Sequence, residues 1–165
     1  GQQYVAVLTG RGGALPLSIG YAIGAAKTVP NLPRLLVFKL GGTAQLPTRV
    51  ALPAGPFNPP PSTARPDQIA AGLQLFGRYC QVCHGASAGG GGVLPDLQRS
   101  SVLADADTWK SILIDGALAK QGMVSFAKVM SPEQAQLIRL YVIDEANWAK
   151  KNLPQGAAAK PTGKP

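Results

Sequence analysis

The stretch YCQVCHG, residues 79–85, constrains this chain more than any other. It contains both cysteines and the only histidine of the 165 residues, so Cys80, Cys83 and His84 stand within five consecutive positions. The two thiols are separated by about one helical turn, and the imidazole follows directly. Any fold proposed for the chain must therefore explain why all of its soft ligands gather at one point.

The Cys-x-x-Cys-His spacing is the attachment signature of c-type haem. Two thiols one helical turn apart can add across the two vinyl groups of a porphyrin. The adjacent imidazole then sits under the ring, where it ligates the iron. The motif therefore predicts one covalent haem c, held by Cys80 and Cys83, with His84 as an iron ligand.

Three other uses of the motif are open but less favoured. A thioredoxin-type cysteine pair would require a βαβ context, which the neighbouring helical patterns do not supply. A structural disulfide is possible in an oxidising compartment, although closing so short a loop stabilises little. A zinc site needs about four ligands, and only three obvious ones are present.

A sixth iron ligand is expected from one of the two methionines, because a methionine raises the reduction potential and suits electron transfer. Met123 lies in KQGMVSF, a glycine-preceded loop that can wrap over the far face of a haem. Met130 stands directly before Ser131, at the start of the last predicted helix. Loop placement favours Met123 as the ligand, with Met130 as the alternative, and either side chain could instead fill the core.

The chain divides into four zones. Two runs rich in β-formers, Gln3–Thr9 and Arg34–Leu40, predict strands near the N-terminus. Two strands cannot form a stable sheet alone, so this part must pair with strands that the chain does not supply. The zones are a β segment (1–46), a proline-rich, extended and semi-rigid linker (47–66), a helical zone (67–147) and a flexible basic tail (148–165).

The first predicted helix leads into the Cys-x-x-Cys-His motif. Ile69, Leu73 and Phe76 recur at helical spacing and give the segment an apolar face. Asp67, directly after a proline, is expected to cap the first turn. The helix then delivers Cys80 to its C-terminal end.

Two more helices are predicted downstream. Ser131, Pro132 and Gln134 form a capping-box pattern, with the proline at the first helical position, where helices tolerate it. A middle helix is expected around Trp109 and should end near Gly116. The fold class predicted for this zone is mainly α.

Charge and hydropathy limit the classes of partner that the chain is expected to bind. The formal net charge is +8, which favours an acidic partner. The basic residues are scattered and form no basic helix or RNP-like pattern, so nucleic acid is not expected. No apolar run reaches the ~18 residues of a membrane span, and no signal-peptide pattern is found, so no transmembrane segment is expected.

The stretch from about Asp67 to Glu145 resembles a class I cytochrome c. That family crosses an N-terminal helix carrying a glycine and an aromatic residue with a C-terminal helix carrying an aromatic residue. Gly72 and Phe76 match the first helix and Tyr141 matches the second. The resemblance implies that the small Gly72 lets the two helices cross closely, and that the carbonyl of Pro95 holds the iron-ligating imidazole.

The same resemblance makes Arg99 and Trp109 candidate partners of the haem propionates. Each has a plainer alternative from its residue type. Arg99 could be an ordinary solvated side chain, and Trp109 could be ordinary core packing.

The N-terminal part carries a second resemblance. GQQYVAVLTGRGGALP followed by RLLVFKLGGTAQLP resembles the last propeller blade of quinohaemoprotein alcohol dehydrogenases. In that family a PQQ-binding propeller is joined by a proline-containing linker to a C-terminal cytochrome c domain. Arg11 departs from the aromatic residue expected in the glycine-rich turn. The family's PQQ contacts, calcium ligands and catalytic aspartate match no motif here, so they are expected only in the absent propeller part.

The resemblance implies a haem c electron-transfer module in the bacterial periplasm. It would accept electrons from PQQ and pass them to an external acceptor, either a protein or a quinone. The rest of the propeller would be its partner, as a separate chain or a missing part, and this segment alone would not oxidise alcohols. Two alternatives are a free-standing monohaem carrier and a ligand-sensing haem protein with an open sixth iron position.

Overall fold

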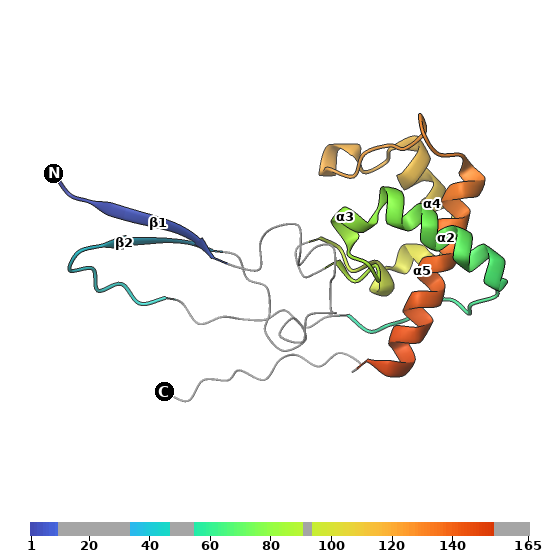
Figure 1. Ribbon diagram of the computed structural model, residues 1–165, viewed down its shortest axis with the longest axis horizontal. Coiled ribbons are helices and arrows are strands. Elements are labelled where there is room, and N and C mark those ends of the chain that lie inside the picture. Colours follow the sequence, from blue (N-terminus) through green and yellow to red (C-terminus); the bar gives the residue numbers. More distant parts are fainter. Residues whose placement is uncertain (10–33, 47–54, 91–93, 154–165) are drawn as a thin grey trace.

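The computed structural model describes residues 1–9, 34–46, 55–90 and 94–153. Figure 1 shows a two-stranded ribbon near the N-terminus and a helical part that carries the Cys-x-x-Cys-His motif. The chain is therefore mainly helical, with a short antiparallel sheet ahead of the helices, as predicted. Along the chain follow β1 (Tyr4–Thr9), β2 (Arg34–Lys39), α2 (Pro66–Tyr79), α3 (Gln81–His84), the short helices η4 (Leu97–Arg99) and η5 (Ser101–Ala104), α4 (Ala106–Lys110), η6 (Ser111–Asp115), η7 (Ala119–Gln121) and α5 (Pro132–Asn152).

The two predicted strands form an antiparallel pair. Tyr4 lies opposite Lys39 and Thr9 lies opposite Arg34, which fixes the register along the whole ribbon. Large apolar side chains of both strands remain exposed in this structure, among them Leu8 at 84% and Leu35 at 61%. The predicted turn after the first strand, including Arg11, lies outside the described residues.

Helices α2 and α5 cross in direct contact at the centre of the helical part. A methyl group built on Gly72 would stand 2.2 Å from the carbonyl oxygen of Leu137 and 2.8 Å from Cβ of Tyr141. The rings of Phe76 and Tyr141 meet at the same crossing, with centroids 5.3 Å apart. The sequence-based pairing of a glycine and two aromatic residues across these helices is confirmed.

The start of α5 follows the predicted capping box. Ser131 Oγ accepts a hydrogen bond from the Gln134 N–H at 3.3 Å. Gln134 Oε1 in turn accepts one from the Ser131 N–H at 2.9 Å, and Pro132 occupies the first helical position. These two bonds satisfy backbone donors that have no partner within the helix.

The predicted cap of α2 is wrong. The helix begins at Pro66, and Arg65 takes the capping position, where its N–H donates to Gln68 Oε1 at 3.0 Å. Asp67 therefore lies inside the first turn, where it forms an exposed ion pair with Arg65. The proline is responsible, because its fixed φ and missing N–H suit the first helical position, so the cap moves to the residue before it.

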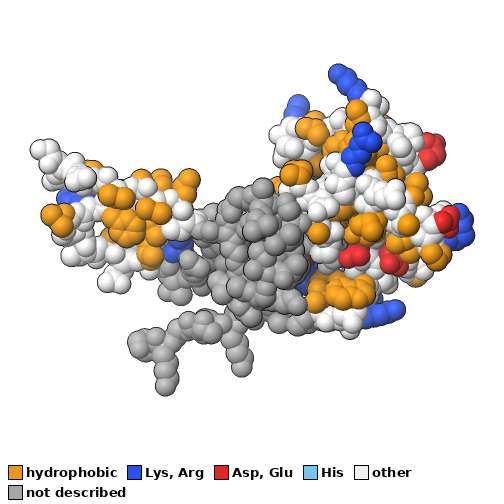
Figure 2. Space-filling view, in the orientation of Figure 1, with side chains coloured by type: hydrophobic (Ala, Val, Ile, Leu, Met, Phe, Trp, Pro, Cys, Tyr) orange, Lys and Arg blue, Asp and Glu red, His pale blue; other side chains and the backbone are white. Residues whose placement is uncertain are grey.

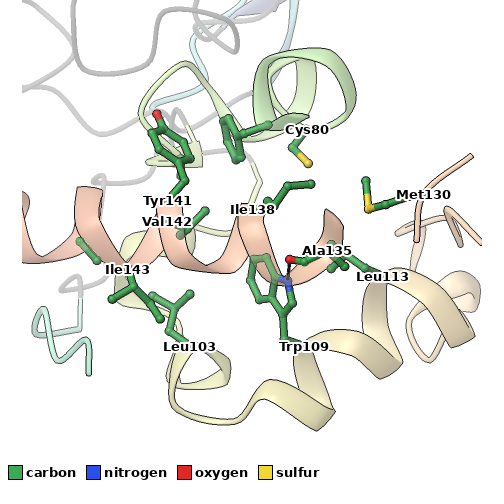
Figure 3. Packing of buried hydrophobic residues seen from close by; sticks show 13 residues of the cluster. Cys80, Leu103, Trp109, Leu113, Met130, Ala135, Ile138, Tyr141, Val142 and Ile143 are labelled. Carbon is green, nitrogen blue, oxygen red and sulfur yellow. Dashed lines mark hydrogen bonds between the residues drawn. The ribbon is translucent and has the colours of Figure 1, made fainter. Parts of the chain in front are cut away.

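The middle helix is confirmed around Trp109, but only its first half is α-helical. Helix α4 continues into η6 as a π-helix, which ends at Gly116 in the left-handed conformation with φ of 75°. The indole N–H of Trp109 donates to the carbonyl of Ala135 at 2.8 Å and so fastens α4 to α5. Figure 3 shows this bond inside the apolar core. The core residues include Phe76, Cys80, Leu103, Trp109, Leu113, Met130, Ala135, Ile138, Tyr141, Val142 and Ile143.

The packed helical part includes residues on both sides of the range 67–147. Helix α5 runs to Asn152, past the expected end at residue 147, and Ala149 on its last turns is fully buried.

Residues 55–62, called the strap below, belong to the predicted linker but pack onto the helices. Phe57 in the strap is only 3% exposed, and Asn147 Nδ2 donates to the Pro60 carbonyl at 2.8 Å.

Charged groups are dispersed over the helical part. On the face drawn in Figure 2, basic side chains occupy separate positions, while apolar side chains gather on the strand ribbon. Within the described ranges, no helix is long and apolar enough to cross a membrane. The dispersed positions of the basic side chains agree with their scattered positions in the sequence.

Replacing Gly72 by alanine is expected to destabilise the protein, because the added methyl group would overlap the Leu137 carbonyl. Overpacking of this kind costs ~1–3 kcal/mol, which exceeds the helix-propensity gain of ~1 kcal/mol. Urea unfolding of the haem-loaded chain should show a lower midpoint with an unchanged slope. Gly77→Ala in the same helix is the matched control, since its new methyl would meet only Gln81 Oε1 at 3.5 Å. A midpoint for Gly72→Ala at or above that of the unsubstituted chain would contradict the packing argument.

Candidate functional site

The Cys-x-x-Cys-His motif occupies a single turn at the end of α2. Cys80 is the capping residue between the end of α2 and the start of α3. Its carbonyl accepts hydrogen bonds from the N–H groups of Cys83 at 3.1 Å and His84 at 2.9 Å. Because α2 is pinned against α5 at Gly72, this turn has a fixed place beside the core. Both thiols are free.

The two cysteines differ in environment. Cys80 is 5% exposed and belongs to the core, whereas Cys83 is exposed. Burial raises the pKa of the Cys80 thiol to about 12, and the neighbouring Cys83 adds to the rise. Cys80 is therefore a protonated thiol at neutral pH in this folded arrangement.

His84 is buried and held in one orientation. Its Nδ1 lies 3.3 Å from the carbonyl oxygen of Pro95, eleven residues further along the chain. A carbonyl can only accept, so Nδ1 carries the proton and the lone pair is left on Nε2. Burial lowers the pKa of His84, partly opposed by the bond to Pro95, so the imidazole is neutral and able to ligate a metal.

A glycine makes room for this carbonyl. Gly90 has a φ of +66°, and a methyl group built on it would stand 2.7 Å from the Pro95 oxygen. The Leu97 N–H donates to the carbonyl of Ala88 at 2.9 Å and closes the loop on its other side. The sequence shows only a run of glycines here, so the specific need for Gly90 could not be predicted without the path of the chain.

The two methionines have different settings. Met130 is 4% exposed and lies in the core cluster with Cys80 and Leu113 (Figure 3). Met123 is partly buried, lies in the predicted loop after η7, and packs against that cluster from its edge.

The loop that carries Met123 is anchored directly after it. Ser125 Oγ donates to the Ile114 carbonyl at 2.6 Å, and the Phe126 N–H donates to the Leu113 carbonyl at 2.8 Å. Both acceptors belong to the π-helix η6. Tyr79, beside Cys80, contacts the same loop, with its ring centroid 6.0 Å from that of Phe126. Sequence reasoning missed these contacts because no local pattern signals them.

The structure places Trp109 and Arg99 among protein partners. The Trp109 N–H donates to the Ala135 carbonyl within the core. Arg99 is not a solvated side chain: its Nε donates to Asp96 Oδ2 at 3.1 Å, its Nη1 donates to the Gly55 carbonyl, and its guanidinium stacks on Phe57. The Trp109 N–H and two donor atoms of Arg99 therefore have partners within the protein.

The donor set fits a haem c. Two thiols on one turn, a neutral imidazole with Nε2 free, and a thioether in an anchored loop could supply two covalent attachment points and two iron ligands. Cys80, Cys83, His84 and Met123 are the residues that would hold such a group. Within the part of the chain that the structure describes, no three His, Cys, Asp or Glu side chains converge to hold a metal ion by themselves.

Comparison with known proteins finds similarity to a cytochrome family and to quinohemoprotein alcohol dehydrogenases. Residues 67–142 match the family model described as cytochrome c oxidase, cbb3-type, subunit III. The chain is 43% identical over 144 residues to the quinohemoprotein alcohol dehydrogenase ADH IIB of Pseudomonas putida, covering 87% of this chain and 21% of that protein. It is also 33% identical over 172 residues to lupanine 17-hydroxylase [cytochrome c] of a Pseudomonas species, covering 99% of this chain and 23% of the relative.

A solved structure extends the match to three dimensions. The quinohemoprotein alcohol dehydrogenase ADHIIG of Pseudomonas putida HK5 superposes with a TM-score of 0.75 at 35% identity, over 93% of this chain and 22% of that one. The chain thus spans only about a fifth of the length of the relatives it matches. Sequence and structure agree that the chain is homologous to the C-terminal portion of quinohaemoprotein alcohol dehydrogenases and that its helical part has a cytochrome c-like fold.

Proposed function

We propose that this chain is the haem c electron-transfer module of a quinohaemoprotein alcohol dehydrogenase. It accepts electrons from PQQ in the propeller and passes them to an external acceptor. The observation that carries the proposal is the Cys80–His84 turn, with the proton of His84 on Nδ1 and its Nε2 left free by the bond to Pro95. The similarity to such dehydrogenases over both the strands and the helices supports the assignment.

Each site residue has a distinct task in this proposal. Cys80 and Cys83 would form the thioether links, and His84 Nε2 and Met123 Sδ would ligate the iron. Pro95 fixes the tautomer and the ring orientation of His84. A haem c bound here supplies one-electron redox chemistry, with a potential raised by the methionine ligand. The apolar residues around Cys80 exclude water from that side of the site.

The strand ribbon is the proposed attachment point to the rest of the enzyme. Residues 1–46 would complete the last propeller blade, which explains why both strands keep large apolar side chains exposed. The alcohol-oxidising site, with its PQQ and calcium, would belong to the part of the relatives that this chain does not span. Covalent haem and PQQ chemistry together support a location in the bacterial periplasm.

The test of this assignment is reduction by alcohol. The haem-loaded chain alone should stay oxidised when an alcohol is added. It should become reduced when a propeller portion of a quinohaemoprotein alcohol dehydrogenase, loaded with PQQ and calcium, is also present and co-migrates with it in gel filtration. Absorption spectra of the haem follow the change. A monodisperse haem protein that never associates with the propeller would favour a free-standing carrier instead.

Replacing both Cys80 and Cys83 by alanine is expected to abolish covalent haem attachment, because no other thiol exists in the chain. The measurement is haem staining on a denaturing gel, together with an intact mass. The unsubstituted chain, produced with the same haem-maturation apparatus, is the positive control. Haem that stays bound to the double variant under denaturing conditions would refute the thioether assignment.

Met123→Ala is expected to lower the reduction potential and to let carbon monoxide bind the reduced iron, because a thioether ligand would be lost. Met130→Leu is the matched control: it preserves the volume of a buried side chain and should leave the spectrum unchanged. The measurements are redox titration and spectra of the reduced protein with and without carbon monoxide. If the spectrum changed only in the Met130 variant, the axial ligand would be Met130.

A further inference from the structure

The Arg99 side chain joins the strap to the loop that carries Pro95. Its guanidinium carbon lies 3.5 Å from the centre of the Phe57 ring, and its Nη1 donates to the strap carbonyl of Gly55. On its other side, Arg99 Nε donates to Asp96 Oδ2 at 3.1 Å. The side chains of Arg99 and Asp96 are 14% and 19% exposed, so the pair is largely removed from water. A guanidinium on an aromatic face gains most when it is desolvated in this way.

Asp96 stands directly after the residue whose carbonyl holds His84. The Pro95 carbonyl and the Asp96 nitrogen share one planar peptide group, so fixing Asp96 also fixes the direction of that carbonyl. Asp96 Oδ1 accepts from the Gln98 N–H at 3.0 Å, and Gln98 Nε2 donates to the Ser87 carbonyl. Gln98 is 2% exposed. Asp96 is thus held by its own turn on one side and by Arg99 on the other.

The strap depends on further contacts with α5. Ser62 Oγ donates to Asp144 Oδ1 at 2.9 Å, and Asn147 donates to the carbonyl of Pro60. These bonds lie at the end of the strap that leads into α2. The other end, at Gly55 and Phe57, is held by Arg99. Residues 55–62 therefore run from the start of the first long helix to the loop of Pro95.

We propose that Arg99 is a positioning residue for the iron ligand His84, and that Phe57 of the strap holds Arg99 in place. This proposal rests on the proposed function, since it assumes that His84 ligates haem iron. Docking of the strap places Phe57 under the guanidinium, Arg99 restrains Asp96, and Asp96 directs the Pro95 carbonyl at Nδ1 of His84. The connection to the propeller is thereby coupled to the iron site.

The direction of the effect follows from ligand basicity. A hydrogen bond from Nδ1 to a carbonyl makes the imidazole a stronger donor to the metal. A stronger donor stabilises the more highly charged iron and lowers the reduction potential. Loosening the strap therefore weakens this hydrogen bond and raises the potential. It also exposes the Nδ1 proton to exchange with solvent.

The experiment compares variants of Phe57 in the full haem-loaded chain. Phe57→Leu keeps an apolar side chain under Arg99 but removes the aromatic face, and Phe57→Ala removes both. Phe57→Tyr keeps the aromatic ring and is the matched control. Redox titration measures the potential, and NMR measures the exchange rate of the His84 Nδ1 proton. We expect a higher potential and exchange about fivefold to tenfold faster in the Leu and Ala variants, with the Tyr variant close to the unsubstituted chain.

Arg99→Gln distinguishes this role from a direct contact of Arg99 with a haem propionate. Arg99→Gln is expected to change the potential and the exchange rate in the same direction as Phe57→Leu. Suppose instead that Arg99→Gln shifted the potential, while Phe57→Leu and Phe57→Ala left the potential and the exchange rate unchanged. Arg99 would then act at the haem itself, and the proposal would be overturned. A chain that carries no covalent haem without any substitution would instead overturn the proposed function.

Discussion

The crossing of α2 and α5 is the contact on which the rest of the helical part depends. The backbones approach so closely at Gly72 that only hydrogen fits between this residue and the Leu137 carbonyl. That approach brings Phe76 against Tyr141 and sets the end of α2, with Cys80, into the core. A crossing even slightly wider would separate the attachment turn from the packed residues behind it. The position of the site is therefore decided by a residue eight positions before the first cysteine.

Features encoded within a few residues were predictable from the sequence. The capping box at Ser131, the two strands and the attachment motif each depend on neighbours along the chain, and the structure contains all three elements. The cap of α2 was assigned to Asp67, whereas Arg65 occupies that position, because the proline between them takes the first helical position. The partnership of His84 with Pro95 came from family resemblance, because no local pattern links residues that far apart.

Contacts between distant segments account for what the sequence could not show. Proline density predicted an extended linker, and extended backbone is compatible with the strap, but proline content does not reveal that Phe57 is buried or that Arg99 covers it. Trp109 likewise has the same local sequence whether its N–H faces a cofactor or, as here, the Ala135 carbonyl. In each case the partner lies more than twenty residues away, and only packing decides the outcome.

The π-helix η6 supplies the carbonyls that hold the loop of Met123. A π-turn accommodates one residue more than the α-helix it interrupts, and here it turns the carbonyls of Leu113 and Ile114 toward Phe126 and Ser125. Deleting one residue between 111 and 115 would restore regular α-helical winding and rotate those two acceptors out of reach. The segment that carries Met123 would lose these two hydrogen bonds, while the helix that runs from α4 into η6 became more regular. The length of this short stretch thus sets where the loop of Met123 can attach.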